Sequence, residues 1–518
     1  MREGKRVRVV VSAYREEKAW KAVSLSVVLL LTASVLPHTA DADQVAWTPE
    51  VLDSGPASQP VLLVDGRDQV HTLWVHNFSL DEDAGPDAVF YARRGRAGIW
   101  THPVDVLVPP RGEGINYPAA VIDAQDRIHL IANLVDGLYC SSARASSADR
   151  AMSWSEFRPI SRAQTGPSGI ALGPGGTIHV VYPEIHTPTA AVYYISSIDE
   201  GLTWSRRQTV SAPDHSEAVA MNAQIAVASS GRLHVVWTET IELFPPSGVF
   251  YAFSDDGGQS WSAPQMMAGR GYNWISIGLE ADDSRVHLIW TGTGDVIGKY
   301  HAMSSDGGLS WSEPEMIFYG WAGYLGPSDF VLDSAGNLHL VTALGGSSER
   351  ASEEWTGGEW HSRGDIFHST WQGDRWDMPE HVSVALWEPQ LEQAVPSVVI
   401  SEGNLLHIAW SGTYHPEAKR KPVWYTARRL EAPRVEVRNL PALAPSPMPS
   451  PEPSVVPTKG PDKATTPVAE EAGRYALPLD DFRADDQPIN AVVVGVAPAV
   501  LIVLGVVGVV AFRRMSRG

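Results

Sequence analysis

Arginine and large aromatic side chains recur in segments of the chain that read as loops. A planar guanidinium can bind a carboxylate through two parallel hydrogen bonds, and an aromatic ring can stack on the apolar face of a sugar. Segment 269–274 (GRGYNW) holds both types. We therefore predict a ligand-binding set consisting of Arg111, Arg162, Arg270, Trp274, Trp321, Arg363 and Trp387. The alternative is that such side chains brace loops or fill space.

Histidine recurs at one place in a repeated segment, at intervals of 50 to 68 residues. These residues are His71, His129, His179, His234, His287, His339 and His407. Repeat units arranged around a ring keep their histidines apart, so the set cannot converge on one metal ion. We predict neutral, buried histidines hydrogen-bonded between repeats, no metal site and no cofactor. Cys140 is the single cysteine, which excludes a disulfide or zinc cluster within the chain and favours a small buried residue.

Each repeat has the pattern of four short strands. An apolar strand, a tight turn, the histidine strand, a variable loop and an aromatic-containing strand are followed by a second turn and a strand opening with Trp. Four strands per unit and seven units predict an all-β fold, a seven-bladed propeller over residues 43–435. The seventh unit lacks a fourth strand. Segment 47–52 (WTPEVL) resembles 261–266 (WSAPQM), so we expect the N-terminal segment to complete the last blade.

The turn between the third and fourth strands carries the sharpest motif, S-x-D-x-G-x-x-W. Three copies fit it strictly, and segment 147–154 departs only at Ala151. The Asp can accept backbone N–H bonds within the turn, and the Gly can adopt positive φ. We interpret the motif as structural. Its residues are Ser197, Asp199, Gly201, Trp204, Ser254, Asp256, Gly258, Trp261, Ser304, Asp306, Gly308 and Trp311.

This motif is the Asp-box, and the chain resembles the sialidase-like superfamily of BNR-repeat β-propellers. The resemblance implies that the boxes lie away from the active site. It also implies three arginines that grip a carboxylate, an Asp acid/base, and a Tyr nucleophile assisted by Glu. Asp83 is then a candidate acid, and Tyr272 or Tyr324 with Glu388 a candidate nucleophile pair. The chain departs from the family in having FRPI (157–160) in place of an F/Y-R-I-P motif, at the position of a fourth strand.

Both ends of the chain carry apolar segments. Val23 to Leu36 is 14 uncharged residues behind a basic leader, which predicts a signal peptide over 1–42. Ala491 to Phe512 is 22 uncharged residues followed by Arg513, Arg514 and Arg517. That pattern predicts a single transmembrane helix (489–512) with a cytoplasmic basic tail (513–518). The Pro-rich, acidic segment 436–488 is expected to form a stalk.

The formal net charge of −20 argues against nucleic acid as a partner. We predict a membrane-anchored extracellular propeller that recognises glycans or surface polymers through its variable loops. Two alternatives remain: an enzyme, either a sialidase-type glycoside hydrolase or a polysaccharide lyase, and a non-catalytic protein-interaction or envelope scaffold.

Overall fold

The structure, a computed structural model, describes residues 47–435 apart from 54, 77–86, 96, 110–113, 186–190, 212–217, 241–247, 270, 281–284, 293–297, 319–326, 345–364, 384–394 and 412–421. The chain divides into two units, Met1–Thr48 and Pro49–Gly518. Only Trp47 and Thr48 of the first are described, and the fold belongs to the second. The predicted signal peptide, stalk, membrane helix and basic tail lie outside the described residues. Among the helices that the structure does describe, none is long and apolar enough to cross a membrane.

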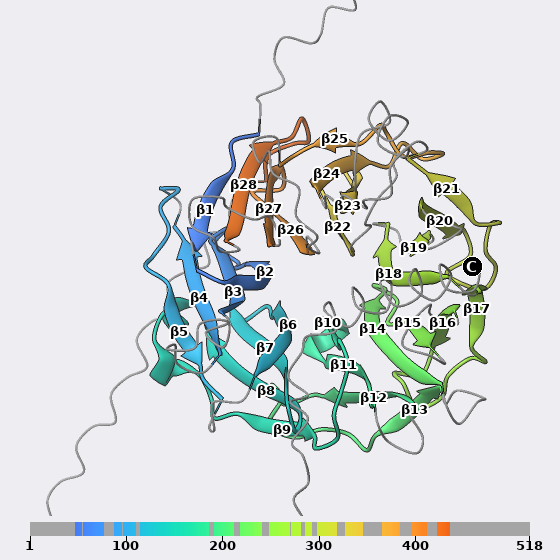
Figure 1. The fold of residues 1–518 in the computed structure, drawn as a ribbon, viewed down its shortest axis with the longest axis horizontal. Coiled ribbons are helices and arrows are strands. Elements are labelled where there is room, and N and C mark those ends of the chain that lie inside the picture. Colours follow the sequence, from blue (N-terminus) through green and yellow to red (C-terminus); the bar gives the residue numbers. More distant parts are fainter. Residues whose placement is uncertain are drawn as a thin grey trace, which may run out of the picture. The chain divides into compact units, whose positions relative to one another are not determined.

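Seven antiparallel sheets of four strands each surround a common centre (Figure 1). In six of them the strands follow one another in sequence, and the first strand lies nearest the centre. Each sheet is one blade. The prediction of an all-β, seven-bladed propeller of four-stranded blades is therefore confirmed.

The first four blades occupy the N-terminal half of the ring. Blade 1 contains β2 (Ala57–Val64), β3 (Val70–His76), β4 (Ala88–Arg94) and β5 (Val104–Leu107). Blade 2 contains β6 (Ile115–Ile122), β7 (Arg127–Leu134), β8 (Gly137–Arg144) and β9 (Arg158–Ser161). Blade 3 contains β10 (Gly169–Leu172), β11 (Ile178–Pro183), β12 (Val192–Ser197) and β13 (Gln208–Ser211). Blade 4 contains β14 (Val219–Val227), β15 (Leu233–Thr240), β16 (Gly248–Ser254) and β17 (Gln265–Ala268).

The last three blades complete the ring. Blade 5 contains β18 (Tyr272–Leu279), β19 (Val286–Gly292), β20 (Gly298–Ser304) and β21 (Glu315–Ile317). Blade 6 contains β22 (Ser328–Leu332), β23 (Leu338–Leu344), β24 (Asp365–Thr370) and β25 (Glu380–His381). Blade 7 contains β26 (Val395–Ser401), β27 (Leu405–Ser411), β28 (Val423–Arg429) and, from the start of the chain, β1 (Glu50–Asp53). Short 3₁₀ helices lie at Ala145–Ser147, Ala151–Ser153 and Pro174–Gly176.

The second strand of a blade is buried on both of its faces. Every residue of β19 and of β23 is buried, because neighbouring blades cover both sides of the sheet. Such strands read as continuous apolar runs rather than as alternating patterns. The hydrophobic clusters join adjacent blades; one combines Val236 and Val249 of blade 4 with Leu288 and Trp290 of blade 5. The core is therefore a ring of interfaces between blades.

Strand β1 closes the ring by pairing with β28, with Glu50 opposite Tyr425 and Asp53 opposite Val423. The expectation that the N-terminal segment completes the last blade is confirmed. The turns joining first to second and third to fourth strands lie on one side of the blades, which we call the box face. The other connections lie on the opposite side, the loop face. Beyond β28 the chain lies against the turn 401–404 on the box face, where Asn404 Nδ2 donates to Ala432 O (2.7 Å) and Val435 N to Glu402 O (2.8 Å).

The repeated histidines are buried, but they bond within their own blades. Their Nδ1 atoms lie 2.6–2.8 Å from a tyrosine hydroxyl of the third strand in blades 1, 3, 4 and 7, and 3.0 Å from another histidine in blades 5 and 6. The prediction of hydrogen bonds between blades was wrong, because the third-strand partner is closer than the next sheet. The tyrosine makes the hydrogen bond between blades: the Tyr194 hydroxyl donates to Gly257 O of the next blade (3.0 Å). Burial lowers the pKa of His179 and His287 to about 4, so these rings are neutral at pH 7.

In each strict Asp-box the serine and aspartate satisfy the backbone of the turn. In blade 4, Ser254 Oγ accepts the N–H of Gly258 (2.9 Å) and Asp256 Oδ1 accepts that of Ser260 (2.9 Å). The Asp256 carboxylate is exposed, and hydrogen bonds from Ser260 lower its pKa to about 2. The boxes of blades 3 and 5 repeat these contacts.

The box of one blade packs on the third strand of the blade before it. Trp261 meets Tyr194 edge-on, with ring centroids 5.3 Å apart, and Trp311 meets Tyr251 in the same way at 4.9 Å. Gly258 has φ +85°, and a Cβ there would lie 2.0 Å from Tyr194 Cε1. The glycine of the motif is therefore required both by its backbone conformation and by the tyrosine beneath it.

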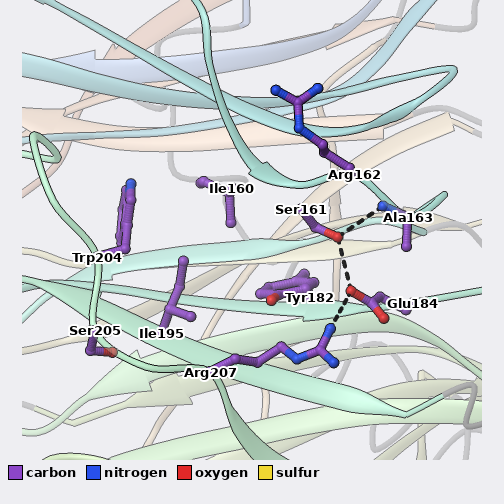
Figure 2. A pocket seen from close by; sticks show the side chains of 10 residues that line it. All are labelled: Ile160, Ser161, Arg162, Ala163, Tyr182, Glu184, Ile195, Trp204, Ser205 and Arg207. Atoms are coloured by element: carbon purple, nitrogen blue, oxygen red, sulfur yellow. Dashed lines mark hydrogen bonds and ion pairs between the residues drawn. The ribbon is translucent and has the colours of Figure 1, made fainter.

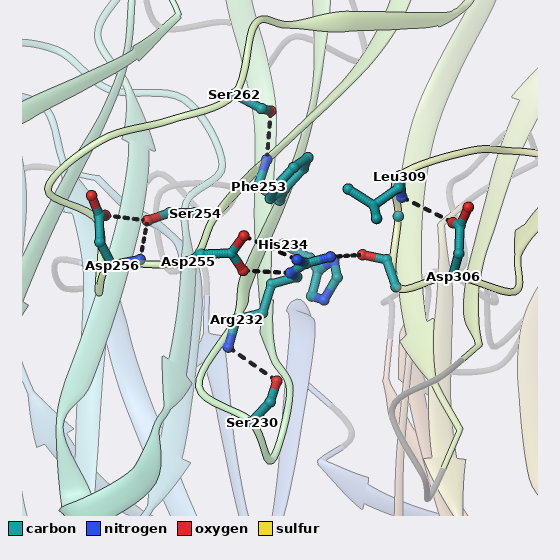
Figure 3. Close-up of polar contacts among 12 residues, drawn as sticks. Ser230, Arg232, His234, Phe253, Ser254, Asp255, Asp256, Ser262, Asp306 and Leu309 are labelled. Carbon is teal, nitrogen blue, oxygen red and sulfur yellow. Dashed lines mark hydrogen bonds and ion pairs between the residues drawn. The ribbon is translucent and has the colours of Figure 1, made fainter.

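Arg232, in the first turn of blade 4, bonds the Asp-box turns of blades 4 and 5 (Figure 3). Its Nε and Nη2 atoms bond the two oxygens of Asp255 (2.6 and 2.9 Å), and Nη1 donates to Gly307 O in the box of blade 5 (2.7 Å). The guanidinium also lies over the Phe253 ring, 4.7 Å from its centroid. Two kinds of contact, the aromatic pairs and this arginine, thus fix one blade to the next on the box face.

Candidate functional site

The loop face carries every connection in which ligand-binding residues were predicted. Arg162 and Trp274 belong to the described residues. Tyr272 and Trp274 lie in β18, so the prediction that they belong to a loop was wrong. The other predicted site residues lie outside the described residues: Asp83, Arg111, Arg270, Trp321, Tyr324, Arg363, Trp387 and Glu388. Arg158, from the segment that departs from the family motif, begins β9 on the outer edge of blade 2 and is exposed, as expected.

Four innermost strands carry a β-bulge near the loop face. The pairing register shifts between Ser58 and Val61 in β2, and at the corresponding points of β6, β14 and β18. At each shift a non-glycine residue adopts a left-handed backbone. These bulge residues are Gln59 (φ 54°), Tyr117 (50°), Asn222 (53°) and Trp274 (46°). Bulky residues rarely adopt positive φ, and bulges of this kind re-aim side chains next to functional sites.

The bulge residues are held in place by neighbouring strands. Gln59 N donates to Ser411 Oγ of blade 7 (3.0 Å), and Gln59 Oε1 accepts the N–H of Tyr117 in blade 2 (2.6 Å). Asn222 Nδ2 donates to Thr238 Oγ1 of its own blade (3.2 Å). Burial raises the pKa of the Tyr117 hydroxyl. The four bulged strands, β2, β6, β14 and β18, all lie nearest the centre of the ring (Figure 1).

A buried lysine lies between blades 5 and 6, close to the bulge at Trp274. Lys299 is 2% exposed, and its Nζ donates to Thr291 Oγ1 (3.0 Å) and Ser328 Oγ (3.3 Å). Burial lowers its pKa to about 7. The neighbouring Asp329 accepts the N–H of Val398 (2.9 Å), and burial raises its pKa to about 6. Such perturbed groups cluster at functional sites, but Lys299 is buried, and its Nζ bonds hydroxyls from both blades.

A pocket of about 460 Å³ opens between the outer strand of blade 2 and blade 3 (Figure 2). We call it the rim pocket; it is lined by Ile160, Ser161, Arg162, Ala163, Tyr182, Glu184, Ile195, Trp204, Ser205 and Arg207. Arg162 is exposed at its edge, with the guanidinium directed away from Glu184 and Arg207 (Figure 2). The structure therefore places one predicted binding residue beside a cavity that the sequence did not indicate.

Blade 6 contains a serine, a histidine and an aspartate in contact, but not as a catalytic triad. Ser383 Oγ lies 3.3 Å from His381 Nε2, and Asp365 Oδ2 lies 3.6 Å from the same nitrogen. A triad requires the serine and the carboxylate to engage opposite ring nitrogens. Ser383 Oγ also accepts the N–H of Ile366 (3.0 Å), so its role here is structural.

No feature of the sequence points directly to Gln59, Tyr117 or Asn222 as bulge residues. Gln59 and Tyr117 each precede a proline, Pro60 and Pro118, which marks the start of an inner strand but not its bulge. Lys299 could have been noticed in the sequence, because strand β20 (GKYHAMS) contains no other lysine, arginine or acidic residue. Among the described residues, no group of three or more His, Cys, Asp or Glu could hold a metal ion.

Residues 170–320 match the family model of the BNR repeat-like domain. The matched segment contains all three strict Asp-boxes, and it lies within a propeller of seven four-stranded blades. No curated protein matches the chain by sequence.

Several solved structures resemble the chain. A protein of unknown function from Dyadobacter fermentans is 10% identical with TM-score 0.45, over 74% of this chain and 99% of its own. The Hadza microbial sialidase Hz136 is 13% identical with TM-score 0.41, over 72% and 66%. A PL25 ulvan lyase, a polysaccharide lyase, is 10% identical with TM-score 0.48, over 73% and 97%. At such identities and TM-scores these similarities carry no conclusion about the chemistry of this chain.

Proposed function

We propose that the protein binds a glycan or another extracellular polymer at the loop-face mouth of its ring. The observation that supports this is the set of bulge residues, because four inner strands hold non-glycine residues in a strained conformation at the same end of the ring. A left-handed backbone costs roughly 1–2 kcal/mol per residue, so the surrounding strands must enforce it. Among the bulge residues, Trp274 contributes a partly exposed indole, which suits the apolar face of a sugar.

A glycan array probed with the full chain tests this proposal. The Trp274→Ala variant should lose most of the binding, because a stacking surface is removed, whereas Trp274→Phe should keep most of it. Melting temperatures should stay close to that of the parent, because Trp274 is only partly buried. The proposal would be contradicted if the parent protein gave no signal on the array, or if the parent and Trp274→Ala gave equal signals. The scaffold alternative would then remain.

Turnover at the same face is a separate proposal, raised by the family resemblance. A hydrolase would create new reducing ends from a bound polymer, and a lyase would create an unsaturated, ultraviolet-absorbing product. Any polymer selected on the array serves as substrate for both assays. Binding without either product would assign the face to recognition alone.

We further propose that the chain is exported and then anchored by segment 489–512. This rests on its uncharged composition and the arginines directly after it. Cell fractionation with a high-salt wash should leave the full chain in the membrane pellet, and truncation after Pro457 should release it. A truncated chain that stays with the pellet would contradict the anchor.

A further inference from the structure

The third strand of blade 2 lacks a tyrosine that four other blades have at the same place. In blades 1, 3, 4 and 7 the hydroxyl of this tyrosine lies against Nδ1 of the repeated histidine, as that of Tyr194 does at His179 (2.7 Å). The strand register places Cys140 of β8 at the position that Tyr194 has in β12. Because a thiol is much shorter than a phenol ring, blade 2 has space where those blades have an aromatic side chain.

This space is a pocket between blades 2 and 3, which we call the Cys140 pocket. A Cβ on Gly201 in the Asp-box above it would meet nothing nearer than Trp204 Cζ2 at 3.7 Å. In the next Asp-box, a Cβ on Gly258 would lie 2.0 Å from Tyr194 Cε1. The box of blade 3 therefore covers the pocket without filling it. Among the residues that line the pocket are His129, Cys140, Ile178, Gly201, Leu202 and Trp204.

His129 supplies the polar group that a ligand in the pocket would meet. It is 4% exposed, and Asp123 Oδ2 lies 2.8 Å from Nε2. The carboxylate draws the proton of the neutral ring to Nε2, so Nδ1 is an acceptor. In blade 1 the equivalent His71 has Asp65 at Nε2 (3.3 Å) and the Tyr91 hydroxyl at Nδ1 (2.6 Å). No residue in the described part of the chain bonds His129 Nδ1, so the pocket presents a buried acceptor that a hydroxyl would satisfy.

The remaining walls of the pocket are apolar, and one side is open. Ile178 and Trp204 line the space, and burial raises the pKa of the Cys140 thiol, which therefore stays uncharged. Leu202 and Arg158 also line it and are exposed, so the opening lies between β9 and the Asp-box of blade 3. The closed part, about 40 Å³, has room for a hydroxyl and the carbons beside it, and the far edge of a ring would lie at the opening.

We propose that the Cys140 pocket binds a phenol, whose hydroxyl donates to His129 Nδ1 and whose ring lies against Trp204 and Ile178. The para position of the ring points out through the opening, so a substituent is tolerated there. A group beside the hydroxyl would meet the pocket walls. Both a free phenolic compound and the tyrosine side chain of another protein have this chemistry. The site goes beyond the proposed function, since it lies beneath an Asp-box and not at the loop-face mouth.

Cys140 is the single cysteine of the chain, so its alkylation by iodoacetamide reports directly whether the pocket is occupied. With the full chain, 4-methylphenol should slow this reaction in a saturable way and raise the melting temperature. Toluene should bind about three- to tenfold more weakly, because it lacks the hydroxyl. 2,6-Dimethylphenol should protect poorly, because its methyl groups flank the hydroxyl.

Two further compounds distinguish the sources of the phenol. N-acetyltyrosinamide carries the side chain of a partner protein's tyrosine, and N-acetylphenylalaninamide is its control without the hydroxyl. Protection of Cys140 by N-acetyltyrosinamide and not by the control would assign the pocket to a tyrosine side chain. Protection by 4-methylphenol alone would assign it to a free phenolic compound.

Three variants test the same fit from within the chain. Cys140→Tyr should raise the melting temperature by about 1–3 °C, because it fills the pocket with its own phenol, and should abolish the response to 4-methylphenol. Cys140→Phe should also abolish the response but stabilise less, because His129 Nδ1 stays without a partner. Cys140→Ser is the matched control, since it keeps the pocket open and should keep the response.

Three outcomes would overturn the proposal. Equal effects of 4-methylphenol and toluene on the parent would show that His129 accepts no hydroxyl. A response to 4-methylphenol that persists in Cys140→Tyr would place the phenol elsewhere. No effect on the parent at about 10 mM 4-methylphenol would leave the pocket to water alone. The comparisons on the parent do not depend on any variant folding, and a glycan array without signals would count against the proposed function and not against the Cys140 pocket.

Discussion

At the residue scale, Lys299 makes the stability of the protein depend on pH. Its folded pKa of about 7 lies below the ordinary lysine value of 10.5, so between these values the unfolded chain binds more protons than the folded one. The free energy of unfolding should therefore rise with pH across that window, by a few kcal/mol at most. Lys299→Met should flatten the rise and stabilise the protein most at pH 7. Urea unfolding of both proteins at pH 7 and pH 9 measures the difference, and parallel curves would show that Lys299 stays charged when folded.

At the scale of the element, replacing the glycine of the Asp-box turn has two possible energetic costs: backbone strain and a clash with a tyrosine of the preceding blade. Gly201 and Gly258 both have positive φ (79° and 85°), so alanine at either should cost about 1–2 kcal/mol in backbone strain. A Cβ at Gly201 meets nothing closer than Trp204 Cζ2 at 3.7 Å, whereas one at Gly258 would lie 2.0 Å from Tyr194. Gly258→Ala should therefore destabilise by about 1–3 kcal/mol more than Gly201→Ala. Thermal unfolding of the two variants provides the test, and equal losses would rule out the tyrosine contact.

The same turn shows why elements were predictable and the site was not. The histidine repeat and the Asp-box recur in register along the chain. The buried strand and the turn therefore predict the same repeating unit, and this identifies the fold. Blade 3 differs because Cys140 occupies the place in blade 2 that Tyr194 has in blade 3, which leaves Gly201 without a close neighbour. The bulges at Gln59 and Asn222 have no sequence signature, because the neighbouring strands impose their positive φ. The pair of Glu184 and Arg207, 23 residues apart, depends on two strand ends meeting in space.

At the scale of the whole molecule, closure of the ring depends on the four residues of β1, Glu50–Asp53. Deleting Glu50–Asp53 would expose the edge of β28 and remove the bond from Trp74 Nε1 to Asp53 Oδ2 (2.8 Å). We expect the melting temperature to fall by about 5 °C or more, with increased aggregation. Adding a peptide of residues 47–55 should raise the melting temperature back toward that of the full chain. An undiminished melting temperature in the deleted chain would mean that six full blades and a three-stranded seventh suffice.

The position at which the chain leaves blade 7, beside the turn 401–404, also affects how the protein responds to a pulling force. Strand β28 runs from the loop face to the box face and has β27 on one side and β1 on the other. A ligand held at the loop face and a tether pulling beyond Val435 would draw β28 along its own length. Because its hydrogen bonds lie across the strand, both rows are sheared together instead of being opened one bond at a time. The blade that joins the two ends of the ring is therefore also the one best arranged to resist force.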